Sequence, residues 1–225
     1  AASRPQSLED MAVSVEPPII PASAEPSAEG SSVPAESVMS EEELPDTVTI
    51  TISAAGDVTL GTHQEQDYGY SFRQAYDQAE NESYFFANVY DIFSADDMTL
   101  VNLEGPLTLA EEAREGQVYS IKGDPEYVNI LTAGSVEAVS MGNNHMMDYL
   151  QQGRDDTVQA VENAGIVYAC EKITGIYEVK GIRIGMISVN EVSQGYLVEK
   201  TIQNAITELQ GQDADLILVS CHWGV

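Results

Sequence analysis

The sequence predicts a layered α/β fold in which a mixed β-sheet is flanked by helices. Three observations support this prediction. From residue 47 onward, apolar runs of strand length alternate with segments of helical periodicity, as in α/β proteins. Residues 215–221 form an apolar run typical of a strand that is buried on both faces. Polar side chains of ligand-binding types follow several of these runs, where open α/β sheets carry their sites.

The chain divides near residue 46. Residues 1–46 contain seven of the nine prolines, nine serines and ten acidic residues, against one basic residue, Arg4. A segment of this composition, without apolar periodicity, cannot bury enough surface to offset the entropy of ordering it. We therefore expect residues 1–46 to be a disordered acidic linker, either a spacer or a plain flexible tail. Residues 47–225 are expected to form the folded domain.

The first part of the domain is predicted to contain two strands and a helix. Residues 47–55 alternate β-branched side chains and predict a strand that ends just before Asp57. Residues 98–103 predict the second strand, which ends at Glu104. Residues 82–94 have helical spacing, which places five apolar side chains on one face: Phe85, Phe86, Val89, Ile92 and Phe93.

The middle of the domain continues the alternation. Pro125 is expected to open a short helix that runs to about residue 133, because proline is well tolerated in a first turn. Residues 136–141 predict the third strand. Residues 151–164 predict a helix, and residues 166–169 a fourth strand.

The last part is predicted to hold a hairpin, a helix and a final strand. The hairpin joins residues 177–180 and 183–189 around Gly181. Residues 198–210 carry apolar side chains at the i, i+3, i+4, i+7 spacing of an amphipathic helix. The final strand, 215–221, leads directly to His222.

The charge balance excludes some classes of partner. The 225-residue chain has 9 basic and 37 acidic residues, a formal net charge of −28. Nucleic acids and anionic lipid headgroups need positive charge, so neither is an expected partner. The acidity suits cations, including metals, although solubility alone also accounts for much of it. No stretch approaches the roughly 20 apolar residues of a membrane-spanning helix.

The N-terminus and the cysteines bear on the compartment. The chain starts at Ala1 with no visible signal peptide, as expected either for a mature protein or for a chain trimmed of its anchor. Cys170 and Cys221 each end an apolar strand-like run, so two buried free thiols are the default expectation. A single disulfide outside the cell remains the alternative.

Side chains suited to metal binding follow four of the predicted strands. They are Asp57 after the first, Asn102 and Glu104 at the second, Asn143, Asn144, His145 and Asp148 after the third, and His222 after the last. Carboxylate, amide and imidazole groups are ligands for divalent ions such as Mn, Fe or Zn. Each group alone has an ordinary alternative as a cap, a turn residue or a core histidine. Their shared position at strand ends favours one site.

Four segments together resemble the CapA family of bacterial capsule and poly-γ-glutamate synthesis proteins, within the calcineurin-like metallophosphatase superfamily. They are Gly56-Asp57-Val58-Thr59-Leu60-Gly61, Asn102-Leu103-Glu104-Gly105-Pro106-Leu107-Thr108, Asn143-Asn144-His145-Met146-Met147-Asp148 and His222-Trp223-Gly224. They occur in the family's order and cover about residues 50–225. The resemblance implies a metallophosphatase-like fold.

The resemblance also implies roles for individual residues. Asp57, Asn144 and His222 resemble metal ligands, and Glu104 takes the place of the superfamily's bridging acid, unless Asn102 is its true equivalent. His145 resembles the histidine that contacts substrate or protonates a leaving group, and Asp148 is its plausible partner. Thr59 stands where the wider superfamily has a histidine, as in the CapA branch. A complete domain of this kind would hold two divalent ions.

Family members continue past the His-Trp-Gly segment to a Gly-His-x-x-His-type pair. This sequence ends at Val225, so we expect it to be a C-terminally incomplete domain, a vestigial site being the alternative.

Two functions are open at this point. The first is a metal-dependent hydrolase or transferase that acts outside the membrane on an anionic capsule polymer or its precursor. The second is a non-catalytic scaffold subunit of a membrane-bound polymer synthase or export complex. Both imply a location at the cell surface, with anchoring through the removed N-terminal segment.

Overall fold

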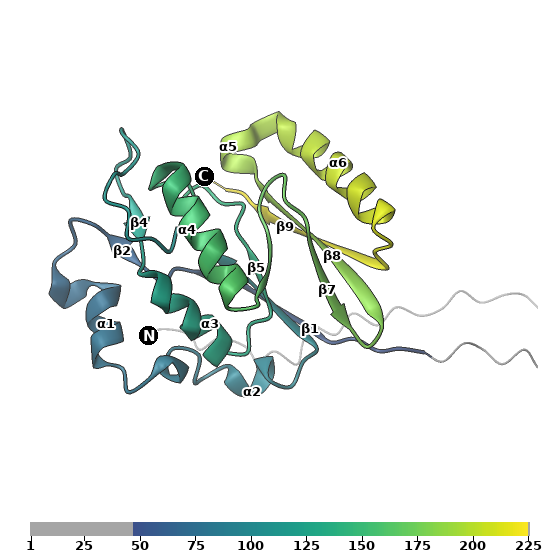
Figure 1. The fold of residues 1–225 in the computed structure, drawn as a ribbon, viewed down its shortest axis with the longest axis horizontal. Coiled ribbons are helices and arrows are strands. Elements are labelled where there is room, and N and C mark those ends of the chain that lie inside the picture. Colours follow the sequence, from purple (N-terminus) through teal and green to yellow (C-terminus); the bar gives the residue numbers. More distant parts are fainter. Residues whose placement is uncertain (1–46, 225) are drawn as a thin grey trace, which may run out of the picture. The chain divides into compact units, whose positions relative to one another are not determined.

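The structure is a computed structural model that describes residues 47–224 (Figure 1). The chain divides into two units between Pro45 and Asp46, and the described residues belong to the second unit. The predicted disorder of residues 1–46 therefore lies outside the described part of the chain.

In place of one mixed sheet, the described residues form two main sheets and a two-strand ribbon of β2 (Thr62–His63) and β4 (Ile121–Lys122). The first is a parallel sheet with the order β1-β3-β5-β6. Its strands are β1 (Ile52–Val58), β3 (Met98–Leu103), β5 (Ala138–Ser140) and β6 (Val167–Ala169). The second has the order β7-β8-β9 and combines antiparallel and parallel pairing. Its strands are β7 (Gly175–Val179), β8 (Ile182–Asn190) and β9 (Leu216–His222).

Helices cover the outer face of each sheet. Those against the first sheet include α1 (Phe72–Gln78), α2 (Tyr90–Phe93), α3 (Val128–Ala133) and α4 (Leu150–Asn163). On the second sheet lies α6 (Val198–Gly211), which follows the short helix α5 (Glu191–Gln194) and a 3-10 turn, η5 (Gly195–Leu197). In Figure 1, α3 and α4 lie on one side of the sheets and α6 on the other. The predicted layered α/β fold is confirmed.

Three apolar clusters hold the layers together. The largest lies between α1–α4 and the first sheet and includes Val101, Leu103 and Val139. A second joins the two sheets through Met98 and Met186 among others. The third lies between α6 and the second sheet. Because strand side chains alternate between faces, each inner strand contributes to two of these clusters.

Several predicted elements are confirmed closely. Strand β3 has the predicted bounds, and α4 and α6 begin and end within one residue of their predictions. Pro125 opens a 3-10 turn, η4 (Pro125–Tyr127), that leads into α3. The hairpin joins β7 and β8 through a turn at Lys180 and Gly181, both with positive φ as a tight hairpin turn requires. Cys170 is buried, Cys221 is half-buried, and both are free thiols.

Two predicted elements are wrong in part. Strand β1 begins at Ile52 and reaches Val58, so Asp57 lies inside it. The helix predicted over 82–94 is a 3-10 turn, η3 (Glu82–Tyr84), followed by loose turns and then α2. The helical path breaks at Val89, whose φ of −122° follows a run with weak helix propensity. As a result Ile92 points to solvent and is 62% exposed.

The last strand is not buried on both faces. Strand β9 pairs with β8 on one side, and no other described strand pairs with it. Leu216 and Val219 are 40% and 43% exposed. Of the described helices, none is long and apolar enough to cross a membrane.

Candidate functional site

The space between the two sheets changes from apolar to polar along the strands. On β3, Met98 and Leu100 contribute to the cluster between the sheets, and Asn102 follows on the same face. On β8, Met186 is followed on that face by Ser188 and then Asn190. The polar residues therefore gather at the carboxyl ends of the parallel strands, where sites in α/β sheets form.

A bulge in β1 turns Asp57 towards this polar end. Ala55 pairs with Val101, but Asp57 pairs with the next residue, Asn102, so Gly56 is an extra residue in the strand. Strict alternation from Ile52 would point residue 57 towards the helices. The extra residue shifts the alternation by one and places Asp57 on the face of Asn102.

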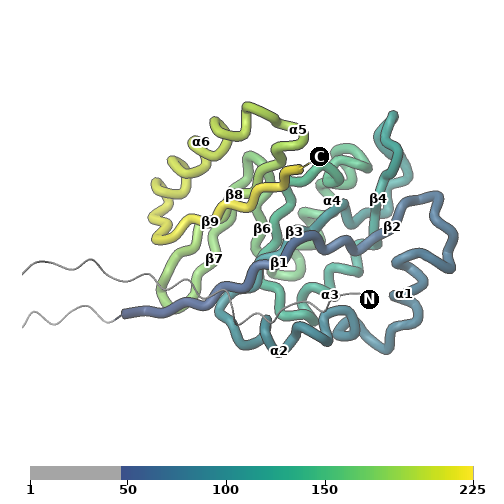
Figure 2. Tube along the Cα trace, turned by 180° about the vertical axis from the view of Figure 1, so that it is seen from behind, coloured from purple at the N-terminus to yellow at the C-terminus, as the bar shows by residue number. Residues whose placement is uncertain are grey.

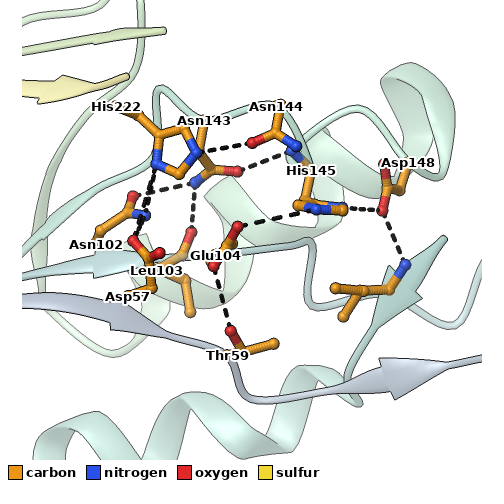
Figure 3. Close-up of polar contacts among 11 residues, drawn as sticks. Asp57, Thr59, Asn102, Leu103, Glu104, Asn143, Asn144, His145, Asp148 and His222 are labelled. Carbon is orange, nitrogen blue, oxygen red and sulfur yellow. Dashed lines mark hydrogen bonds and ion pairs between the residues drawn. The ribbon is translucent and has the colours of Figure 1, made fainter. Parts of the chain in front are cut away.

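Asp57, Asn102 and His222 form one chain of contacts across the two sheets (Figure 3). Asn102 Nδ2 donates to Asp57 Oδ1 at 2.7 Å and lies 3.3 Å from His222 Nδ1. His222 Nδ1 is 3.8 Å from Asp57 Oδ1. In Figure 2, β9 and β1 run in the same general direction across the view. Asn102 thus lies between the two predicted ligands.

The segment after β5 carries a glycine, Gly142, where the sheets approach closely. The Gly142 amide donates to Ser188 Oγ at 2.7 Å, and Ser188 Oγ lies 2.7 Å from Ser140 Oγ. A Cβ atom on Gly142 would lie 2.7–2.8 Å from atoms of Ser188, which is closer than real Cβ contacts. The absence of a side chain therefore allows this segment to cross β8.

Asn143 joins this segment to the end of β3. Its Nδ2 donates to the Leu103 carbonyl at 2.8 Å and to Asn102 Oδ1 at 3.2 Å. Its Oδ1 accepts the His145 amide at 3.2 Å, and the residue is buried. The sequence predicted no separate role for Asn143. The sequence shows only an amide residue directly before Asn144 and His145, and this does not reveal which way the Asn143 side chain points.

Asn144 and His222 meet although 78 residues separate them. His222 Nε2 lies 2.7 Å from Asn144 Oδ1. The imidazole therefore presents Nε2 to Asn144 and Nδ1 to Asn102 and Asp57. Two amides and one more distant carboxylate surround this ring.

His145 has a different environment. Its Nδ1 lies 2.7 Å from Oδ2 of Asp148, a fully buried carboxylate that also accepts the Ile121 amide at 2.8 Å. This hydrogen bond raises the pKa of His145, against the opposing effect of burial. Because Asp148 Oδ2 can only accept when ionised, Nδ1 must donate. The titrating nitrogen is then Nε2, which lies 3.9 Å from Glu104 Oε1.

Glu104 lies beside both halves of the site. Thr59 Oγ1 donates to its Oε2 at 3.4 Å. Burial, and then the nearby Asp57 carboxylate, raise the pKa of Glu104, while His145 and His222 lower it. All six predicted residues are thus brought to one edge of the sheets, as Figure 3 shows. They form two groups: Asp57, Asn144 and His222, and Glu104, His145 and Asp148.

The donor types suit a divalent ion, but their arrangement suits two ions less well. Asp57, Asn144 and His222 offer a carboxylate, an amide oxygen and an imidazole nitrogen. His222 faces the other two through opposite nitrogens, so one ion cannot bind all three unless the ring turns. Between Asp57 and His222 lies the neutral amide of Asn102. Within residues 47–224, no group of three or more His, Cys, Asp or Glu residues is placed to hold a metal.

The fold and this edge site define the class of protein: a layered α/β domain with a polar site at the carboxyl ends of its parallel strands. The family model of the bacterial capsule synthesis protein PGA_cap matches residues 51–225, and the chain belongs to that family.

Curated relatives agree with this assignment. The chain is 25% identical over 196 residues to "PGA biosynthesis protein CapA" of Bacillus subtilis (strain 168), covering 78% of this chain and 49% of that protein. It is 24% identical over 204 residues to "Capsule biosynthesis protein CapA" of Bacillus anthracis, covering 78% and 46%. The chain thus spans about half the length of these relatives.

Two further similarities are shorter or weaker. A "Probable polyglutamine synthesis accessory protein" of Mycobacterium tuberculosis (strain H37Rv) is 36% identical over 73 residues, 32% of this chain and 19% of that protein. The crystal structure of a 5'-nucleotidase precursor from Thermus thermophilus aligns with a TM-score of 0.44 at 14% identity. That alignment covers 78% of this chain and 37% of the nucleotidase.

Proposed function

We propose that this domain is a metal-dependent hydrolase or transferase that acts on an anionic capsule polymer or its precursor. The observation that carries the proposal is the meeting of Asp57, Glu104 and His222 with the 144–148 segment at one sheet edge. Membership of the capsule synthesis family supports the class of substrate. The names of the Bacillus relatives agree with it.

In this proposal Asp57, Asn144 and His222 hold divalent ions of the Mn, Fe or Zn type, with Glu104 as a further carboxylate. A bound ion would act as a Lewis acid and lower the pKa of a water molecule. Two ions are proposed for the complete centre. The His222 ring must turn, or further ligands must join, for both to bind.

His145 is the proposed general acid. Its Nδ1 is held by the buried Asp148, which leaves the Nε2 proton facing Glu104 and the remaining site. The raised pKa of His145 keeps a larger fraction of the ring protonated near neutral pH. A proton on Nε2 could therefore pass to a leaving group.

The experiment measures metal content together with hydrolysis of phosphoester and γ-glutamyl amide bonds, in this chain and in any longer native form. Asn144→Ala and His222→Ala should each lower metal affinity or activity by roughly 10–100-fold. The exposed Asn88→Ala, remote from the site, serves as the matched control and should change neither quantity. Absence of bound metal, together with activity that neither site variant changes, would refute the proposal.

Two observations favour a second function. The amide of Asn102 lies between Asp57 and His222, where two ions would need a bridging carboxylate, and Thr59 takes the place of the superfamily's histidine. The alternative is a non-catalytic scaffold subunit of a membrane-bound polymer synthase or export complex. It predicts that Asp57→Ala and His145→Ala leave polymer production in cells unchanged. Loss of polymer in either variant at normal protein level would exclude it.

Both functions imply that the domain lies outside the cytoplasmic membrane and is anchored to it. The proposed partners are the polymer and membrane synthase subunits. Protease treatment of intact cells tests this location, because an external domain would be digested while a cytoplasmic marker survives.

A further inference from the structure

A cavity lies near the site. It has a volume of about 390 Å³ and is bordered by α1 and a two-strand ribbon, β2 (Thr62–His63) paired with β4 (Ile121–Lys122). Lys122, on its wall, directly follows Ile121, whose amide binds Asp148. Tyr149 follows Asp148, and the Lys122 ammonium lies over its ring, 4.7 Å from the centroid. The cavity and the site are thus neighbours along two segments.

Arg73 is fixed at this cavity by a group outside its wall. Asp77 Oδ1 accepts from Arg73 Nε at 2.9 Å, and Asp77 Oδ2 accepts from the Tyr68 hydroxyl at 2.9 Å. Arg73 and Tyr68 both line the cavity, whereas Asp77 does not. Within residues 47–224, the two terminal guanidinium nitrogens make no hydrogen bond. They are therefore available to an anion.

Lys122 is held in a similar way. Its ammonium donates to the Ala110 carbonyl and lies over the Tyr149 ring, so its position is set without a carboxylate. No described acidic residue forms an ion pair with it. An ammonium has three donors, so at least one remains for a ligand.

The rest of the wall suits a flexible chain with aliphatic stems. Phe72 and Tyr127 form an aromatic wall, their rings 5.1 Å apart at an interplanar angle of 61°. Gln64 also lines the cavity, and its Oε1 accepts from the Tyr149 hydroxyl at 2.8 Å, which leaves its Nε2 as a donor. The acidic residue on the wall, Asp124, caps the turn that follows by accepting the Glu126 amide.

The cavity is less acidic than the domain around it, since its wall carries Arg73 and Lys122 against Asp124, while Asp77 pairs with Arg73 from outside the wall. Residues 47–225 have 27 acidic and 8 basic residues, 27 − 8 = 19, a net charge of −19. Fields beyond about 8 Å are screened at physiological ionic strength, so nearby cations decide whether an anion binds. Two of the eight basic residues line this one cavity, whose volume is within the range of ligand sites.

We propose that this cavity binds a segment of a flexible, carboxylate-bearing chain. Its carboxylates would lie on Arg73 and Lys122, and its methylene stems against Phe72 and Tyr127. The inference rests on the proposed function for the presence of such a polymer. It deepens that function by giving the polymer an anchoring site beside the proposed reacting groups. The acidic surface elsewhere on the domain would repel such a polymer.

The test is a calorimetric titration of the 225-residue chain with a γ-linked glutamate trimer in metal-free buffer, where no turnover occurs. The trimer should bind, and binding should weaken as salt is added. Arg73→Gln and Lys122→Gln should each weaken it roughly three- to tenfold. Lys200→Gln, an exposed charge on α6, is the matched control and should leave affinity unchanged.

Three results would overturn the inference: no binding of the trimer, equal affinity in the Arg73→Gln and Lys122→Gln variants, or equal binding of inorganic phosphate. Equal binding of a glutamine trimer would also contradict it, because the proposal requires carboxylates. Binding should persist in His222→Ala, which separates this inference from the proposed hydrolase. If Asn144→Ala leaves hydrolysis unchanged while the trimer still binds at Arg73 and Lys122, the proposed activity alone is wrong.

Discussion

His145 and His222 both follow strands at the same sheet edge, but they lie in different surroundings. His145 is held by Asp148, a buried carboxylate 2.7 Å from its Nδ1. His222 contacts the amides of Asn102 and Asn144, and its nearest carboxylate oxygen, in Asp57, is 3.8 Å away. A charged partner favours a protonated ring, whereas amides also suit a neutral one. This difference supports the proposed roles, proton transfer for His145 and metal ligation for His222.

The largest effect is expected for Gly142→Ala, because Gly142 supports the segment that carries His145 and contacts His222 through Asn144. Gly142→Ala would place a Cβ atom against Ser188 and push the 143–148 segment away from β8. We expect it to lower the free energy of unfolding by about 1–3 kcal/mol and to shift the NMR signals of both histidine rings. Denaturant unfolding measures the first effect. Gly211→Ala, which meets no atom within 4 Å, is the control; equal losses in the two variants would contradict this explanation.

Addition of a divalent ion should distinguish the roles of His145 and His222. If His222 is a ligand, Mn²⁺ at about 100 times its dissociation constant should stabilise the protein by about 2.7 kcal/mol. His222→Ala should abolish most of this gain, and His145→Ala should retain it. Thermal unfolding with and without Mn²⁺ measures the gain. A loss of the same size in both variants would remove the proposed division of roles.

Of the two histidines, only His145 should change its pKa in the Asp148→Asn variant. The variant weakens the hydrogen bond, and removes the charge, through which Asp148 raises the pKa of His145, so that pKa should fall. It also weakens hydrogen bonds to Nδ1 and to the Ile121 amide, at a cost of about 1–3 kcal/mol in unfolding free energy. NMR titration of both histidines measures the change. The exposed Asp155→Asn is the control, and an unchanged His145 pKa in Asp148→Asn would contradict the assignment.

The same pair gives a pH dependence of stability. The folded pKa of His145 is raised above its ordinary value of about 6.5. Its contribution to stability is therefore present below that value and is lost as pH rises through the raised folded pKa. The stability difference between wild type and Asp148→Asn should be larger at pH 5 than at pH 9, as urea unfolding at both values would measure. A difference that does not change with pH would count against a protonated His145.

The smallest effect on stability is expected for substitution of His222 in the absence of metal. His222 hydrogen bonds to neutral amides, so His222→Ala should change unfolding free energy by only about 1 kcal/mol. Urea unfolding in metal-free buffer measures it. A loss above that of Asp148→Asn would show that His222 is chiefly a structural residue.

The sequence predicted the elements well where apolar runs had clear ends. Strand β3 and helix α6 are examples, since both present a regular apolar face. The sequence prediction placed Asp57 after the first strand, whereas the structure has it inside β1. Ala54, Ala55 and Gly56 are small and reveal neither the inward face of the strand nor the bulge. The helix over 82–94 was overestimated because aromatic spacing alone does not show that the path breaks at Val89.

The candidate site was predictable in composition but not in geometry. Strand ends alone indicated which residues would meet. Whether Asn102 or Glu104 lies between Asp57 and His222 depends on the β1–β3 register, which pairs Asp57 with Asn102. The Asn144–His222 contact depends on how the two sheets face each other, and no local pattern encodes that distance.

The pairing of β9 with β8 has a consequence for folding. Asn102 and His222 are 120 residues apart, and their contact closes only when the last strand has docked in parallel beside β8. Long-range parallel pairing forms slowly, because the chain loses loop entropy before those contacts compensate for it. His145 and Asp148, three residues apart, need no such event. During synthesis, the ligand half of the site should therefore mature after the acid half.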